Sequence, residues 1–333
     1  MSGSQAVIEA RELRKSFGGR RGVVEAVRGV SIDVAAGEIF GFLGPNGAGK
    51  TTTLRMLTTL MPIDSGSATV AGCNVERDPD SVRARIGYVS QLGGSDDLAS
   101  GRENLVLQGR LYGDDAASVR VRAAELIDQL DLTEFADRRV STYSGGQRRR
   151  LDIALGIVHR PEVLFLDEPS SGLDPQNRAN LWDHVTALRD RGTTVFLTTH
   201  YLEEADSLCD RLMIIDHGEI VAEGTPQELK RQVAGDTVLL NLREEADAAR
   251  ALEAVSSQPY VRESSAEGAD VRLYVEDGGE ALPQLLRLLD QAGIALRSMS
   301  LSEPTLDDVF LRQTGRSLRD TAEDGGGDGG GRW

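Results

Sequence analysis

The 333-residue sequence has no long apolar run. A membrane-spanning helix needs about 20 consecutive, mostly apolar residues, and no segment of this chain approaches that. The first five residues contain neither the basic region nor the apolar core of a secretion signal. We therefore expect the chain to work in the cytosol, and any role at a membrane to require a separate partner protein.

Basic residues and cysteines are also scarce. Lys and Arg number 37 against 53 Asp and Glu, which gives a formal net charge of −16 at pH 7. A nucleic-acid-binding surface needs clustered Lys and Arg, so this balance argues against DNA or RNA as a partner. The two cysteines, Cys73 and Cys209, lack the spacing of metal ligands and are expected to be small buried residues in a reducing compartment.

A glycine-rich segment over residues 44–51 is the first feature that points to a chemistry. It matches the pattern G-x-x-x-x-G-K-[ST] of phosphate-binding loops. A short apolar run over residues 38–43 precedes it, and helix-forming residues follow over 52–60, with Pro62 closing the helix. Because strand, glycine loop and helix is the context in which such a loop works, the match predicts a nucleoside triphosphate site.

Roles within this loop follow from residue type. Glycines let backbone N–H groups converge on phosphates without side-chain obstruction, and the start of the next helix adds its positive end. We expect Lys50 to reach the β- and γ-phosphates and the Thr51 hydroxyl to ligate Mg²⁺, so the predicted cofactors are ATP and Mg²⁺. The nucleotide-binding residues predicted in this segment are Gly44, Pro45, Asn46, Gly47, Ala48, Gly49, Lys50, Thr51 and Thr52.

An apolar segment over residues 163–166 ends in two carboxylates, Asp167 and Glu168. Ligands gather at the carboxyl ends of the strands in a parallel sheet, which suits this pair. Asp167 is placed to hold Mg²⁺ through water, and Glu168 is placed to polarise the attacking water as a general base. The alternative, an acidic strand end that faces solvent, is disfavoured by the phosphate loop.

A second glycine motif consists of Ser144, Gly145, Gly146 and Gln147. Its serine and its glycine N–H groups would form an anion site at a helix start. With these motifs, residues 7–229 strongly resemble the nucleotide-binding subunit of ATP-binding-cassette transporters. In that family the second motif caps the γ-phosphate of ATP on the opposite subunit. The resemblance therefore implies an ATPase that closes as a homodimer around two ATP molecules and works with separate integral membrane permease subunits.

The resemblance also implies roles for single residues. Gln91 resembles the glutamine that senses Mg²⁺ and links to the membrane partner, Asp174 belongs to a loop that communicates across the dimer, and His200 resembles the histidine that contacts the γ-phosphate. Phe17 lies where the family stacks an aromatic ring on adenine, with a core aromatic as the alternative. Tyr143 departs from the family, which most often has leucine there. The residues predicted to act in catalysis are Lys50, Glu168 and His200, and those at the metal are Thr51, Gln91 and Asp167.

Other ATPases of this fold fit less well. A DNA-repair or chromosome-organising member would need a long coiled-coil insertion, for which the interval between Gln91 and Ser144 is too short. A translation-associated member would carry two cassettes, whereas this chain has one. A non-catalytic regulatory protein is conceivable, but it should have lost Glu168 or His200.

Two groups of residues match no catalytic role. The first is expected on a salt-bridged or phosphate-proximal helix surface and consists of Arg148, Arg149 and Arg150. The second is expected at surface or turn positions and consists of His159, His184 and His217.

Apolar strands that alternate with helices predict an α/β fold with a parallel sheet. The resemblance implies a P-loop NTPase core with antiparallel β and helical subdomains over residues 1–232, the helical part at about 92–150. From residue 233 the predicted order is β-α-β-β-α-β, which is typical of a ferredoxin-like α+β domain over 233–315. The leucines at positions 282, 285, 286 and 289 are expected in its core. Residues 316–333 are expected to be a disordered, Gly-rich acidic tail. Individual strands are predicted at 6–13, 30–34, 163–166 and 193–197, helices at 116–130, 178–189 and 280–292, and a hairpin at 211–222 that turns at 217–218.

The C-terminal segment narrows the family. Residues 303–311, followed by Thr314 and Gly315, resemble the ending of the daunorubicin-resistance type of drug-export ATPase. That resemblance implies ATP-driven efflux of a drug-like or antibiotic-like molecule at the cytoplasmic face of the cell membrane. Export of a lipid or another natural product is the alternative, and the extension itself could serve only to stabilise the dimer.

Overall fold

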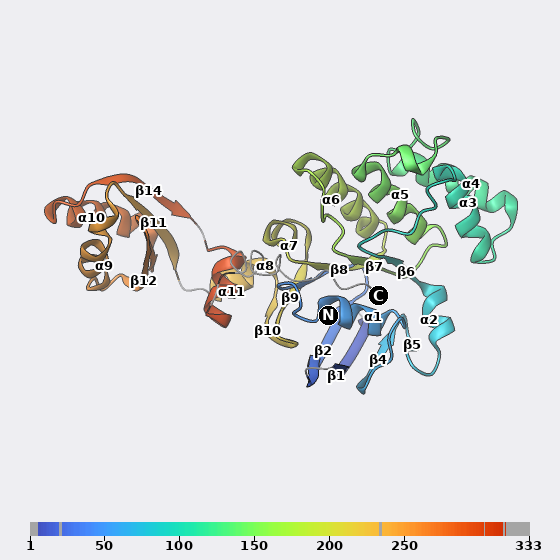
Figure 1. The fold of residues 1–333 in the computed structure, drawn as a ribbon, viewed down its shortest axis with the longest axis horizontal. Helices are drawn as coiled ribbons and strands as arrows, with labels where there is room; N and C mark the ends of the chain where they lie inside the picture. Colours follow the sequence, from blue (N-terminus) through green and yellow to red (C-terminus); the bar gives the residue numbers. More distant parts are fainter. Residues whose placement is uncertain (1–5, 20–21, 233–234, 303, 316, 318–333) are drawn as a thin grey trace. The chain divides into compact units, whose positions relative to one another are not determined.

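The computed structural model describes residues 6–19, 22–232, 235–302, 304–315 and 317. The start of the chain and, apart from Ser317, the predicted tail over 316–333 lie outside the described residues. The chain divides into two compact units, one ending at Pro226 and one spanning Gln227–Ser317 (Figure 1). Within the described ranges, no helix is both long enough and apolar enough to span a membrane.

Six strands form the central sheet of the first unit, in the order β10-β9-β3-β8-β7-β6. They are β3 (Ile39–Leu43), β6 (Ile86–Val89), β7 (Val163–Asp167), β8 (Thr194–Thr199), β9 (Arg211–Asp216) and β10 (Glu219–Gly224). All pair in parallel except β10, which returns antiparallel to β9. β3, β7 and β8 are buried along their whole length, as expected for apolar runs covered on both faces. The predicted parallel sheet and the turn at residues 217–218 are confirmed.

Helices cover both faces of this sheet (Figure 1). α1 (Lys50–Leu57) lies on one side, and α5 (Gly145–Ile157) and α6 (Pro175–Asp190) lie on the other. In the core, the ring centroids of Phe40, Phe42 and Phe165 lie 5.5 to 5.8 Å from that of Phe196. This cluster packs β3, β7 and β8 together, so that the segments after their carboxyl ends meet at one edge of the sheet.

A second, antiparallel sheet has the order β2-β1-β4-β5. Its strands are β1 (Ala6–Gly19), β2 (Gly22–Ala35), β4 (Ser65–Val70) and β5 (Cys73–Asn74). β1 and β2 are much longer than the predicted strands over 6–13 and 30–34. The predictions were too short because the outer parts of these strands are exposed and lack the apolar pattern from which a strand is predicted. Register shifts interrupt the pairing of β1 with both neighbours, and such irregularities bend and twist strands.

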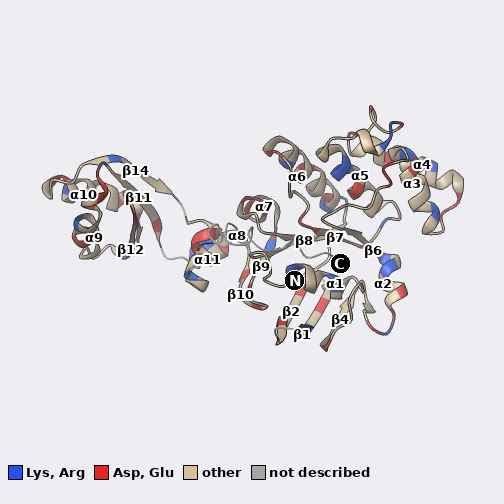
Figure 2. Cartoon of the chain, in the orientation of Figure 1, with Lys and Arg blue, Asp and Glu red and all other residues tan. Residues whose placement is uncertain are grey.

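The helical part comprises α3 (Gly101–Leu111), α4 (Ala116–Gln129), the short 3₁₀ turn η1 (Val140–Thr142) and α5. α3 starts with a reciprocal capping box between Ser100 and Glu103. Three successive arginines, Arg148 to Arg150, lie in the first half of α5, whose ribbon is blue there (Figure 2). α6 begins three residues before the predicted 178, because Asp174 caps it and Pro175 opens it. Two short helices, α2 (Pro79–Arg85) and α7 (Leu202–Leu208), were not predicted.

The second unit contains α8 (Pro226–Gln232), β11 (Asp236–Leu242), η2 (Glu245–Asp247), α9 (Ala248–Ser256), β12 (Val261–Glu267), β13 (Asp270–Val275), α10 (Gly278–Gln291), β14 (Leu296–Ser302) and α11 (Leu306–Thr314). Its sheet is antiparallel in the order β12-β13-β11-β14. This topology confirms the predicted β-α-β-β-α-β arrangement.

Two sequence expectations for this unit need correction. Leu285 and Leu289 are fully buried, whereas Leu286 is 51% exposed, because it lies off the face of α10 that packs on the sheet. α11 was not predicted, although Thr305 and Asp308 cap its start reciprocally. The T-x-x-D spacing was the available signal.

Candidate functional site

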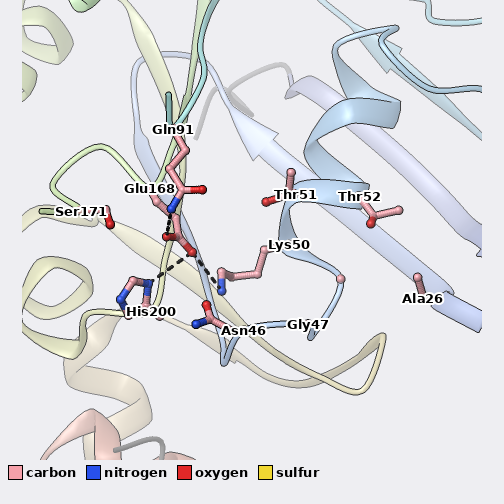
Figure 3. A pocket seen from close by; sticks show the side chains of 11 residues that line it. Ala26, Asn46, Gly47, Lys50, Thr51, Thr52, Gln91, Glu168, Ser171 and His200 are labelled. Atoms are coloured by element: carbon pink, nitrogen blue, oxygen red, sulfur yellow. Dashed lines mark hydrogen bonds and ion pairs between the residues drawn. The ribbon is translucent and has the colours of Figure 1, made fainter. Parts of the chain in front are cut away.

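A cavity of about 550 Å³ opens at the carboxyl edge of the central sheet (Figure 3). The phosphate loop follows β3, Glu168 follows β7 and His200 follows β8. The residues that line the cavity are Ala26, Asn46, Gly47, Gly49, Lys50, Thr51, Thr52, Gln91, Glu168, Ser171 and His200. The structure therefore gathers most of the predicted loop residues with Gln91, Glu168 and His200. Ala26 was missed, since nothing local in the sequence marks it as cavity-lining. Ser171 begins the loop over 171–174 that the family resemblance singled out, of which only Asp174 was predicted as a binding residue.

The phosphate loop requires glycine at three positions for different reasons. A Cβ at Gly44 would lie 2.3 Å from the Ile215 carbonyl oxygen. Gly49 has a φ of +108°, and its Cβ would lie 2.5 Å from the Ala26 carbonyl oxygen. Gly47 meets nothing within 4 Å, but its φ of +79° is left-handed. Each glycine allows the backbone to turn into α1, whose first N–H groups have no partner within the helix.

Lys50 is the first residue of α1, and its side chain is 4% exposed. Its ammonium donates hydrogen bonds to the Gly44 and Pro45 carbonyls at 2.7 and 3.0 Å and lies 3.6 Å from Glu168 Oε1. Burial lowers the pKa of Lys50 from its usual value, although the neighbouring Glu168 opposes the shift. The charge is thus held inside the loop, at the centre of the cavity (Figure 3).

Glu168 occupies a strained position, with a φ of +44°. For a residue other than glycine this conformation costs about 1–3 kcal/mol and persists where its surroundings dictate it. Gln91 Nε2 donates to Glu168 Oε2 at 3.0 Å, and His200 Nδ1 lies 3.2 Å from Oε1. Burial alone would raise the pKa of Glu168, but His200 and Lys50 hold it below its usual value. The group is therefore a carboxylate at neutral pH, as an acceptor of a water proton must be.

The oxygen atoms beside the loop suit a magnesium ion. Thr51 Oγ1 donates to Asp167 Oδ1 at 3.1 Å, and Thr198 Oγ1 donates to the same oxygen at 2.6 Å. Mg²⁺ prefers hard oxygen ligands and is usually held by one or two carboxylates together with substrate phosphates. In the described part of the chain no group of three or more His, Cys, Asp and Glu could hold a metal by itself. The Thr51 hydroxyl, Asp167 and the Gln91 amide oxygen form a donor set that fits Mg²⁺ bound with a nucleotide.

The remaining predicted residues lie away from the cavity lining. Phe17 is 41% exposed near the end of β1, so it is not a core aromatic; Lys15 Nζ lies 5.9 Å from its ring centroid. Gly44, Pro45 and Ala48 form the inner turn of the loop. The second glycine motif and Asp174 lie at helix starts outside this cavity.

The second glycine motif lies at the start of α5, where Ser144 and Gly145 are exposed and Gly146 is buried. Ser144 caps α5 and exchanges capping hydrogen bonds with Gln147. A Cβ at Gly146 would lie 2.3 Å from Asn177 Oδ1, and Asn177 is in turn hydrogen-bonded to Asp174. The start of α5 therefore packs against the start of α6, and only glycine permits this approach.

The three unassigned histidines have different surroundings. His217 lies at the turn between β9 and β10 and is exposed, as predicted. His159 lies in the turn after α5, also as predicted, and is half-buried: its ring stacks on Tyr112 at a centroid distance of 3.7 Å and its Nε2 lies 2.9 Å from the Ile86 carbonyl. His184 departs from the expectation, because it lies within α6 and its side chain is 13% exposed. Burial lowers the pKa of His159 and also that of His184.

Comparisons with known proteins match both units of the chain. The model of the ABC transporter family matches residues 27–171, and the model of the C-terminal domain of DrrA1-3-like ATP-binding proteins matches residues 224–314. The daunorubicin/doxorubicin resistance ATP-binding protein DrrA of Streptomyces peucetius is 46% identical over 325 residues, or 95% of this chain and 96% of that protein. The daunorubicin resistance ATP-binding protein DrrA2 of Streptomyces coeruleorubidus is 44% identical over 316 residues, or 94% and 97%.

Among solved structures, the dimeric post-hydrolysis state of the ATP-binding cassette MJ0796, bound to ADP and Pi, has a TM-score of 0.60 to this chain. The match covers 66% of this chain and 98% of that chain at 24% identity, and it shows the fold. Together, the P-loop fold and the similarity along nearly the whole sequence show that the chain belongs to the ATP-binding proteins of ABC transporters and is an ATPase.

Proposed function

We propose that this chain is the ATP-hydrolysing subunit of a bacterial drug exporter, that it works as an ATP-closed homodimer, and that separate membrane permease subunits carry the cargo. The central observation is the gathering of Lys50, Gln91, Glu168 and His200 in one cavity, while Ser144 and Gly145 are exposed and lie outside that cavity. The relatives' names, which refer to daunorubicin and doxorubicin resistance, support a drug-like or antibiotic-like cargo.

The argument for the dimer is the position of Ser144 and Gly145 at the exposed start of α5. The first N–H groups of a helix have no intrahelical partner and favour anions, and α5 offers such a start at the surface. Within one protomer this start lies outside the phosphate cavity. In the proposed dimer, Ser144, Gly145 and Gly146 of one protomer bind the γ-phosphate held by Lys50 of the other.

In the proposed reaction, the phosphates bind over the loop and at the start of α1, where Lys50 exchanges its carbonyl partners for phosphate oxygens. Mg²⁺, when bound near Thr51, Asp167 and Gln91, supplies positive charge that balances the phosphates. Glu168 accepts the proton of the attacking water, and His200 holds that carboxylate in place and contacts the γ-phosphate. Phe17 supplies an exposed ring on which adenine stacks.

A second surface of the first unit suits the permease. A cavity of about 240 Å³ lies between the segment after β6 and α3, with Gly93, Gln108 and Tyr112 in its lining. Leu92 and Leu111, the sequence neighbours of the lining residues Gly93 and Tyr112, are 93% and 73% exposed. We propose that the permease docks here. Leu92 directly follows Gln91, and the Gln91 side chain donates a hydrogen bond to Glu168. In this proposal, a permease that contacts Leu92 would therefore act on the position of the general base through Gln91.

Drug accumulation in cells tests the exporter function. The chain is co-expressed with a candidate permease subunit from the same organism, and intracellular doxorubicin is followed by its fluorescence. We expect lower accumulation than in cells that express the permease with the Glu168→Gln variant. Equal accumulation in the two cultures would contradict drug export by this pair.

A further inference from the structure

Arg149 is a buried cation that the reaction described above does not use. It lies in the first turns of α5 and is 7% exposed. Its guanidinium donates to three main-chain carbonyls: Nε to Pro169 at 2.7 Å, Nη1 to Ser90 at 2.7 Å and Nη2 to Asp167 at 3.1 Å. Burial lowers the pKa of Arg149, with the charge of Asp152 as the largest opposing effect. A guanidinium removed from water needs such partners.

The three carbonyls belong to residues that adjoin the catalytic groups. Asp167 and Pro169 lie directly before and after Glu168, and Ser90 lies directly before Gln91. Arg149 therefore holds the backbone on both sides of the strained Glu168 and at the start of the Gln91 segment. These two side chains are themselves hydrogen-bonded at 3.0 Å.

Helix α5 joins Arg149 to the second glycine motif at the start of the helix. Ser144 lies five residues before Arg149 on α5, a distance of about 7.5 Å along the axis at 1.5 Å per residue. A helix transmits displacement over such a length as a rigid rod. In the proposed dimer, Ser144 contacts the nucleotide of the partner, while Arg149 contacts the backbone that carries this protomer's own base.

The neighbouring arginines lack this geometry. Arg148 pairs with Asp97 at the surface. Arg150 donates to the carbonyls of Leu130 and Asp131, both at 3.2 Å, beyond the end of α4. Arg150 thus provides a matched comparison, since it uses the same chemistry on the same helix and does not contact the catalytic segments.

We propose that Arg149 is a positioning residue that couples the two nucleotide sites of the dimer. It transmits the seating of the partner's ATP on α5 to Glu168 and Gln91 of its own protomer. This inference rests on the proposed function, because it requires the composite dimer. Lysine cannot replace arginine here, since one ammonium lacks the planar fork that reaches three separate carbonyls.

The test compares Arg149→Lys with Arg150→Lys for ATP affinity, kcat and the Hill coefficient of ATP hydrolysis. Because Lys50 and the phosphate loop are untouched, we expect Arg149→Lys to bind ATP within about 3-fold of the parent chain, as a positioning role requires. We expect its kcat to fall at least ~10-fold and its Hill coefficient to approach 1. Arg150→Lys should match the parent in all three measurements. Parent-like kcat and cooperativity in Arg149→Lys would overturn the inference.

A double-mutant cycle separates coupling from a merely structural role. If Arg149 acts through Ser144, the losses of kcat in Ser144→Ala and Arg149→Lys combine non-additively, and additive losses would contradict this. Arg149→Gln is the second variant if the lysine chain does not fold; loss of ATP binding in both would assign Arg149 a general structural role and overturn the inference. ATP-dependent dimerisation of Glu168→Gln, measured alone, reports on the proposed function separately. A dimer there together with normal Arg149→Lys kinetics would remove only the coupling role.

Discussion

Replacing Glu168 by Gln removes one charge and little else. The amide has almost the volume of the carboxylate, and its oxygen can still accept the hydrogen bond that Gln91 donates at 3.0 Å. What is lost is the proton acceptor, together with the negative charge 3.6 Å from Lys50 Nζ and 3.2 Å from His200 Nδ1. The substitution therefore tests the base with minimal change to the fold.

The expected loss of turnover follows from the role of Glu168 as a general base. A positioned general base contributes about 10²–10⁴-fold to a rate, which corresponds to about 2.7–5.4 kcal/mol of barrier at 1.36 kcal/mol per decade. ATP binding should be retained or tightened, because the lost carboxylate repels the phosphate that Lys50 is predicted to contact. The variant should therefore accumulate as an ATP-bound closed dimer.

Two measurements check this prediction. Phosphate release at saturating ATP and Mg²⁺ gives kcat, and size-exclusion chromatography with light scattering gives the mass with and without ATP. Glu203→Gln is the control, since Glu203 is an exposed carboxylate on the helix after His200 and lies outside the cavity. Turnover of Glu168→Gln within about 10-fold of the parent would remove Glu168 from the base role. A monomer at saturating ATP would contradict the dimer.

Two smaller predictions concern backbone geometry and pH. Gly44→Ala should abolish ATP binding, because its Cβ would lie 2.3 Å from the Ile215 carbonyl oxygen. Gly47→Ala should only weaken binding, because no atom lies within 4 Å of the added Cβ. Equilibrium titration with ATP compares the two variants, and equal losses of affinity would contradict the steric argument. Burial and Asp308 raise the pKa of Tyr274 to about 12. The folded state then keeps the proton longer than the unfolded state, so this contribution to stability is complete below pH 10 and is lost as the pH rises towards 12. Absorbance titration at alkaline pH should show a tyrosine that ionises at about pH 12 and is missing in Tyr274→Phe.

Local sequence determined the phosphate loop, the acidic strand end and the capped helix starts. In each case neighbours in the chain set the conformation: glycines admit the turn before Lys50, an apolar run forms β7, and Ser100 and Glu103 close a capping box on their own backbone. Gln91 and His200 were predicted from the family resemblance, and the folded sheet brings them to Glu168 because the carboxyl ends of its parallel strands meet at one edge.

Tertiary structure alone decided the rest. Nothing in three successive arginines distinguishes Arg149, whose role depends on carbonyls at residues 90, 167 and 169 that only the folded sheet brings within reach. The exposed Leu286 was mispredicted for the same reason. Burial and hydrogen-bond partners are properties of segments far apart in the chain, and a local pattern records which residue types are present but not which distant surfaces cover them.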